Sequence, residues 1–176
     1  GESAVWVIIE SGDKAADDAA ESSLVEQLRK LEKSLMLPEL TEDDPKLRSD
    51  LPLRIAFSTL RISRQDPAER VYIGMLERRD PELAKKMAGQ PLLLPVFGRG
   101  RALGALPASE MTPRNIEEAC VFISGACSCE VKELNPGYDL MLAADWDALI
   151  EGREISVPPL PALVGLAPMP LAAGDV

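Results

Sequence analysis

The chain has 176 residues, a formal net charge of −10 and no histidine, and 46% of its residues are hydrophobic. This composition predicts one globular domain with a buried core, and the acidic charge disfavours binding to nucleic acid or to an anionic membrane surface. The absence of histidine excludes Ser-His-Asp and Cys-His catalytic units and histidine-ligated metals within the chain. No run of roughly 18 apolar residues occurs, so no membrane span is expected.

The first part of the chain predicts a strand and then a long helix. Residues 4–9 (AVWVII) are rich in β-formers and favour a buried strand. A turn at residues 11–13 precedes a helical pattern from Lys14 to Met36, and Pro38 is expected to end that helix. Its predicted apolar stripe consists of Ala16, Ala19, Ala20, Leu24, Leu28, Leu31 and Leu35.

A loop and a second strand follow. Residues 38–52 are polar and rich in proline, which predicts the loop. Residues 53–62 alternate apolar and polar side chains and predict the strand, with a bulge near Thr59. The residues expected to face inward are Ile55, Phe57, Leu60 and Ile62.

Two helices come next. Asp66 as a cap and Pro67 in the first turn predict a helix through residues 71–79. Pro81 opens a shorter predicted helix, which Gly89 closes.

A hairpin and a further helix are then expected. Residues 91–97 (PLLLPVF) predict a buried strand, and a tight turn at 98–100 connects it to a returning strand at 101–106. Thr112 and Pro113 begin a helix that ends at a glycine. Its apolar residues are Ile116, Ala119, Cys120 and Ile123.

The C-terminal part is marked by prolines. After a turn at residues 135–137, residues 138–150 predict a strand and a short helix. We therefore expect a domain over residues 1–152 and a proline-rich tail over residues 153–176. The tail is interpreted either as a strap packed on the domain or as a flexible extension.

This order of elements, β-α-β followed by β-β-α, resembles the thioredoxin-like fold. Residues 90–106 (QPLLLPVFGRGRALGAL) resemble the thioredoxin stretch in which a cis proline opens a strand, an aromatic residue ends it and a glycine turn leads into a hairpin. Pro91, Phe97 and Gly100 are the matching positions. The resemblance covers about residues 4–125. It implies an α/β domain with a mixed sheet and flanking helices, here followed by a C-terminal extension.

The redox chemistry of that family is not expected at its usual place. Thioredoxins carry Trp-Cys-x-x-Cys directly after the first strand, where the helix end lowers a thiol pKa. The matching residues 10–18 contain no cysteine. The chain also resembles uncharacterised bacterial proteins that share the stretches VFGRGRAL and CSCEVKELNPGYDLML, and that resemblance implies no function.

Cys127 and Cys129 stand one residue apart in a chain with three cysteines. They are interpreted as structural thiols or a structural disulfide, as a redox or thiol-binding pair, or as ligands of a soft metal such as Cu(I) together with Cys120 or Met141. Pro91 joins the redox and binding candidates, because the matching proline of thioredoxins lies beside their working surface.

Two other groups of residues are candidates for binding. Arg99 and Arg101 flank the turn glycine and could hold an anion, with a solvated hairpin tip as the alternative. Tyr138, Asp139 and Trp146, with the proline-rich tail, form either a partner surface or part of the core.

The function expected from these patterns is that of an exported binding or scaffold module with an unidentified protein partner, no cofactor and no enzymatic activity. Export to the periplasm is expected because the start, Gly1-Glu2-Ser3, looks trimmed. The alternative is a thiol-based redox or soft-metal-binding protein that uses Cys127 and Cys129.

Overall fold

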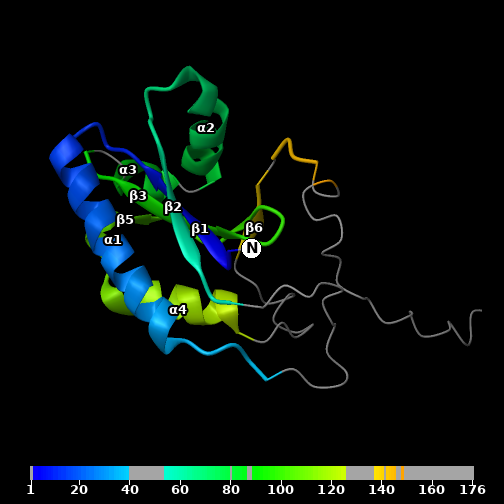
Figure 1. Cartoon of the computed structure of the whole chain (residues 1–176). Coiled ribbons are helices and arrows are strands. Elements are labelled where there is room, and N and C mark those ends of the chain that lie inside the picture. The colour runs from blue at the N-terminus through cyan, green and yellow to red at the C-terminus, as the bar shows by residue number, and fades with distance from the viewer. Residues whose placement is uncertain are drawn as a thin grey trace, which may run out of the picture.

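The computed structural model describes residues 2–39, 54–79, 81–86, 89–125, 137–140, 142–145 and 148. Within them a mixed β-sheet carries helices on both faces (Figure 1), which confirms the expected α/β class. Cys127, Cys129, Trp146 and the tail at 153–176 lie outside the described residues.

The elements follow one another in the predicted order. The strands are β1 (Ala4–Ile9), β2 (Phe57–Ile62), β3 (Leu92–Phe97), β4 (Arg101–Ala102), β5 (Leu106–Pro107) and β6 (Tyr138–Asp139). The helices are α1 (Lys14–Ser34), α2 (Arg70–Arg79), α3 (Pro81–Lys86) and α4 (Pro113–Ser124), with 3-10 turns η1 (Pro67–Glu69) and η2 (Ala108–Glu110).

The sheet has the strand order β2-β1-β3-β4-β6. β1 and β2 are parallel, with α1 in the crossover between them, whereas β3 runs antiparallel to β1 and forms a hairpin with β4. β5 pairs with the start of β3, and β6 pairs with β4. The expected sheet that joins residues 4–9, 53–62 and 91–97 is therefore present.

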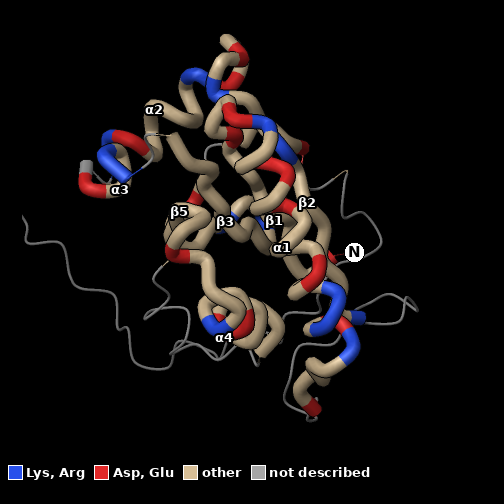
Figure 2. The backbone as a smooth tube through the Cα atoms, turned by 90° about the vertical axis from the view of Figure 1, so that its left-hand side faces the viewer, with Lys and Arg blue, Asp and Glu red and all other residues tan. Residues whose placement is uncertain are grey.

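The two faces of the sheet are covered differently. α1 and α4 pack on one face, where they bury Trp6 and Ile8 of β1 and Leu93 of β3. α2 and α3 pack on the opposite face, where they cover Val7, Ile9, Leu92 and Leu94. Charged residues lie along the helices, whereas β1 and β3 carry none (Figure 2).

The structure corrects the prediction for the second strand. β2 begins at Phe57 rather than at residue 53, and it pairs with β1 in continuous register, so no bulge interrupts it near Thr59. Phe57 packs against the core on the α1 side, and Ile62 packs on the α2 side. Because helices cover both faces, half-buried residues of β2 contact different layers and no single inward face exists.

The returning strand of the hairpin is also shorter than predicted. Instead of one strand over residues 101–106, the chain forms β4 and then β5, both opposite β3. Leu103 donates its N–H to the Pro95 carbonyl at 3.1 Å. Proline has no N–H with which to complete that pair, so the ladder is interrupted there.

The start of α1 differs from its predicted apolar stripe. Leu24, Leu28 and Leu31 are buried as predicted, but Ala19 is exposed. Asp17 is buried in its place, with 2% of its surface exposed.

Candidate functional site

A buried carboxylate shapes the loop between β1 and α1. Asp17 accepts hydrogen bonds from the N–H of Ser11 at 2.7 Å, from the Ser11 hydroxyl at 2.8 Å and from the N–H of Gly12 at 3.3 Å. Asp13 caps α1 through its own carboxylate. Because these carboxylates satisfy the N–H groups of the turn and of the first helical residues, the loop has a defined shape without any thiol.

The end of β2 and the start of β3 lie at the same edge of the sheet as this loop. Arg64, just after β2, donates from Nη2 to the carbonyl of Gln90 at 2.9 Å. Burial lowers the pKa of Arg64, and the charges of Glu77 and Asp17 oppose that effect. No peptide bond among the described residues is cis, including the one before Pro91, so the cis proline expected there is a wrong prediction.

Cys120 is the one cysteine that the structure describes. Its side chain is buried between α4 and the sheet, and burial together with the negative charge of Glu32 raises its pKa to about 12. Such a thiol stays protonated and unreactive at neutral pH. Within the described part of the chain no group of three or more Cys, Asp or Glu side chains could hold a metal. The redox and metal roles of Cys127 and Cys129 stay predictions.

The two hairpin arginines have different surroundings. Arg101 donates to the Asp139 carboxylate at 2.9 Å and to the Gly137 carbonyl at 2.9 Å, and so connects β4 to β6. Arg99 is exposed at the turn. An anion site at this pair stays a prediction, and Arg101 already stabilises the β6 pairing.

An ion-pair network connects α1 to β2 on the outer side of the sheet. Arg61 donates to Glu10 and Asp18 at 2.8–2.9 Å and to Glu21 at 3.2 Å. Hydrogen bonds from Lys14 and then from Arg61 lower the pKa of Asp18. Each of the three carboxylates forms an ion pair with Arg61, so we assign the network to stability rather than to binding.

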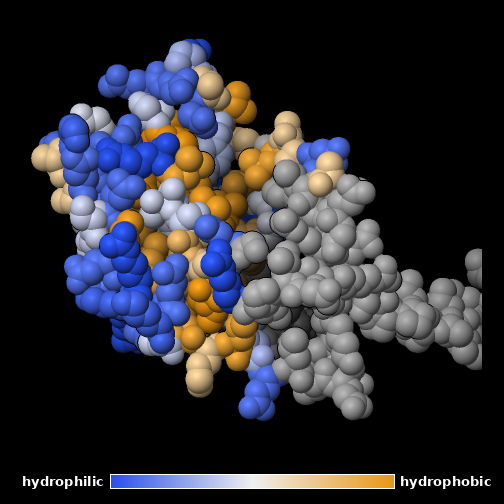
Figure 3. Space-filling view, viewed as in Figure 1, coloured by the Kyte–Doolittle hydropathy of each residue, from blue (hydrophilic) through white to orange (hydrophobic). Residues whose placement is uncertain are grey.

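An apolar groove lies between α2 and the less covered end of the sheet, and we call it the α2 groove. Its volume is about 690 Å³. Three of its residues are large hydrophobics with unusual exposure, namely Leu60 (52%), Val71 (75%) and Leu142 (47%). Figure 3 shows hydrophobic surface gathered beneath α2. Further walls are formed by Val5, Val7, Ile62, Met75 and Val96.

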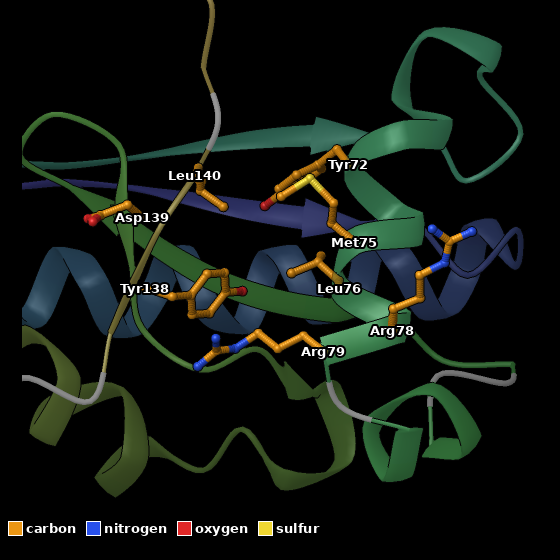
Figure 4. Close-up of a pocket in the computed structure, with 8 residues that line it drawn as sticks. All are labelled: Tyr72, Met75, Leu76, Arg78, Arg79, Tyr138, Asp139 and Leu140. Atoms are coloured by element: carbon orange, nitrogen blue, oxygen red, sulfur yellow. The ribbon is translucent and has the colours of Figure 1, made fainter.

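The groove continues into a second hollow of about 430 Å³ between α2 and β6. Tyr72, Met75 and Leu140 line both parts, so we treat them as one groove. The only two tyrosines of the chain, Tyr72 and Tyr138, both lie here. In Figure 4 their hydroxyl groups point into the space between α2 and β6. Two of the residues considered for a partner surface from the sequence, Tyr138 and Asp139, thus line this hollow.

The hydroxyl of Tyr72 is buried and has no hydrogen-bond partner among the described residues. Burial also raises the pKa of Tyr72, so the group remains a neutral donor at any physiological pH. A buried hydroxyl without a partner is costly, and most such groups in proteins find an acceptor. The α2 groove therefore contains a donor directed toward whatever fills it.

Comparison with protein-family models, with curated proteins and with solved structures finds no match. Of the helices that the structure describes, none combines the length and the apolar character needed to cross a membrane.

Sequence reasoning missed most of the α2 groove. It assigned Leu60 to an inward face and Val71, Tyr72 and Met75 only to a helix. The sequence contained one signal for this site: the chain has only two tyrosines, and one of them, Tyr138, was already a candidate for a partner surface. That Tyr72 lies opposite Tyr138 depends on the packing of α2 beside β6.

Proposed function

We propose that the protein is a binding module of thioredoxin-like architecture whose α2 groove holds an extended apolar segment of a polypeptide. The strand order β2-β1-β3-β4, with α1 and α4 on one face and α2 on the other, supports the thioredoxin-like part. Carboxylates take the place of thiols in the loop after β1, which argues against dithiol exchange at that loop.

One observation carries the binding role: an apolar groove with exposed Leu60 and Val71 ends at two tyrosines, and the hydroxyl of one of them has no hydrogen-bond partner among the described residues. A contiguous exposed apolar surface commonly marks an interaction site. Apolar walls with a few polar groups are typical of ligand sites, and tyrosines are enriched where partners bind.

Peptide display tests this role. A random peptide library is selected on the native chain, on a groove variant with Leu60→Glu and Val71→Glu, and on a control variant with Met36→Glu and Val121→Glu. The control residues are also exposed hydrophobics, at 88% and 49%, but they lie outside the groove. We expect apolar, proline-containing sequences to be enriched on the native and control chains and lost on the groove variant. Equal enrichment on the two charge variants contradicts the proposal.

The thiol-based alternative rests on the spacing of Cys127 and Cys129 alone. Alkylation of the folded protein followed by mass spectrometry separates the two functions. Under the binding proposal, either all three thiols react slowly, or two of them form a structural disulfide that reductant opens only after unfolding and the third reacts slowly. Fast modification at 127 or 129 in the folded chain supports the thiol-based function instead.

A further inference from the structure

We infer that the α2 groove is occupied by the chain's own proline-rich segment, residues 155–174. This inference rests on the proposed function, since it names the first occupant of the same groove. A partner would then have to displace this segment.

The path of the chain brings the segment to the groove. After β6, Leu140 and Leu142 line the groove, and Asp145 follows within the described residues. Ile155 is ten positions after Asp145, and a fully extended chain of ten steps spans at most roughly 35 Å. The segment therefore starts within reach of the groove that its own chain has just lined.

The composition of the segment fits an apolar groove. Residues 155–174 contain no charged side chain and five prolines, at positions 158, 159, 161, 168 and 170. No charge needs to leave water when such a segment binds to apolar walls. Prolines also favour the extended polyproline II conformation, which loses little entropy on binding and is recognised by aromatic-lined grooves. Tyr72 and Tyr138 supply such a lining.

The hydroxyl of Tyr72 provides the polar part of the match. It is buried, and no described residue accepts its hydrogen bond. A polyproline II segment makes no internal hydrogen bonds, so its backbone carbonyls are free to accept one. The groove thus offers a donor where this segment offers acceptors.

Because residues 155–174 belong to the same chain as the groove, even a weak intrinsic affinity is enough for them to occupy it. A short linker gives an effective concentration of about 1 mM, so an intrinsic dissociation constant of about 0.1 mM already fills the groove in roughly nine of ten molecules. A free peptide that competes with the tethered segment then binds about tenfold more weakly than it would to an empty groove.

Photo-crosslinking in the full chain tests the occupant. A benzophenone amino acid replaces Val71 in the groove or, as a control, Val121 on α4, which is also exposed. Trypsin releases residues 154–176 as one peptide, because Arg153 is the last basic residue. We expect irradiation of dilute monomers to connect position 71, and not position 121, to this peptide within the same chain. Cross-links to a second copy, cross-links elsewhere in the chain, or none at all overturn the inference.

A second measurement separates this inference from the proposed function. Leu160, Leu163 and Leu166 are changed to Asp in a tail variant, and binding of a dye-labelled synthetic peptide of residues 155–174 is measured. We expect about tenfold tighter binding to the tail variant than to the native chain, and loss of binding when Leu60→Glu and Val71→Glu are added. Equal, groove-dependent affinity for both chains overturns self-occupation but leaves the binding function standing. If the peptide does not bind the tail variant and peptide display selects no sequence that depends on the groove, both the self-occupation inference and the proposed binding function are wrong.

Discussion

The guanidinium of Arg79 lies over the ring of Tyr138, with its central carbon 4.1 Å from the ring centroid. The contact joins the last residue of α2 to the first residue of β6, which are distant in sequence. It closes the tyrosine end of the α2 groove (Figure 4). Cation–π contacts of this kind at partly exposed sites contribute about 0.5–1 kcal/mol.

A double-mutant cycle with Arg79→Gln and Tyr138→Leu measures this contact. We expect a coupling of about 0.5–1 kcal/mol in the free energy of unfolding by urea. Arg78→Gln is the matched control, because Arg78 lines the same hollow but no cation–π contact with Tyr138 is found for it. A coupling for the Arg78 cycle as large as that for Arg79 contradicts the assignment.

Tyr72→Phe tests whether the buried hydroxyl has an acceptor in the full chain. If residues 155–174 supply a carbonyl, the variant loses a hydrogen bond, and unfolding should become easier by about 1 kcal/mol. If no acceptor exists, removing an unsatisfied hydroxyl should leave stability unchanged or raise it. Urea unfolding of the full chain decides between these outcomes, with Tyr138→Phe as a control for the loss of a phenol oxygen.

Cys120 should make stability depend on alkaline pH. Its folded pKa, about 12, lies above the ordinary value of 9.0, so the unfolded chain loses the thiol proton first as the pH rises. The stability contributed by this thiol is therefore complete below pH 9 and declines between about pH 9 and 12. In urea unfolding over this range, the native chain should lose more stability than Cys120→Ala does. Parallel curves for the two chains contradict the buried, protonated thiol.

Two glycines should respond in opposite ways to alanine. Gly12 in the loop after β1 has φ 96°, and the nearest atom to an added Cβ is Gln65 Nε2 at 3.9 Å, so the cost of Gly12→Ala is backbone strain of about 1–2 kcal/mol. Gly74 lies inside α2 with nothing within 4 Å of an added Cβ, and Gly74→Ala should stabilise by roughly 0.5–1 kcal/mol. Thermal unfolding of both variants checks the signs. Stabilisation by Gly12→Ala would show that the loop does not need its left-handed glycine.

Local patterns predicted the elements well where one feature dominates. β1 covers the predicted residues 4–9, and α1 begins at Lys14, directly after its Asp13 cap. α4 begins at Pro113, directly after its Thr112 cap, as predicted, because a cap and a proline in the first turn mark a helix start within a few residues. Errors occurred where a distant element decides the outcome, as in the faces of β2 and the interruption of the hairpin at Pro95.

Residue types alone show which chemistry the chain lacks. It contains no histidine, and residues 10–18, directly after the first strand, contain no cysteine, so both facts hold for any fold. The fold was needed to show that Asp17 is buried, that Leu60 and Ile62 of β2 face the α2 side, and that Tyr72 lies near Tyr138. Burial and proximity depend on which strands pair and which helix covers them. Those choices follow from contacts between residues far apart in the chain, which no local pattern contains.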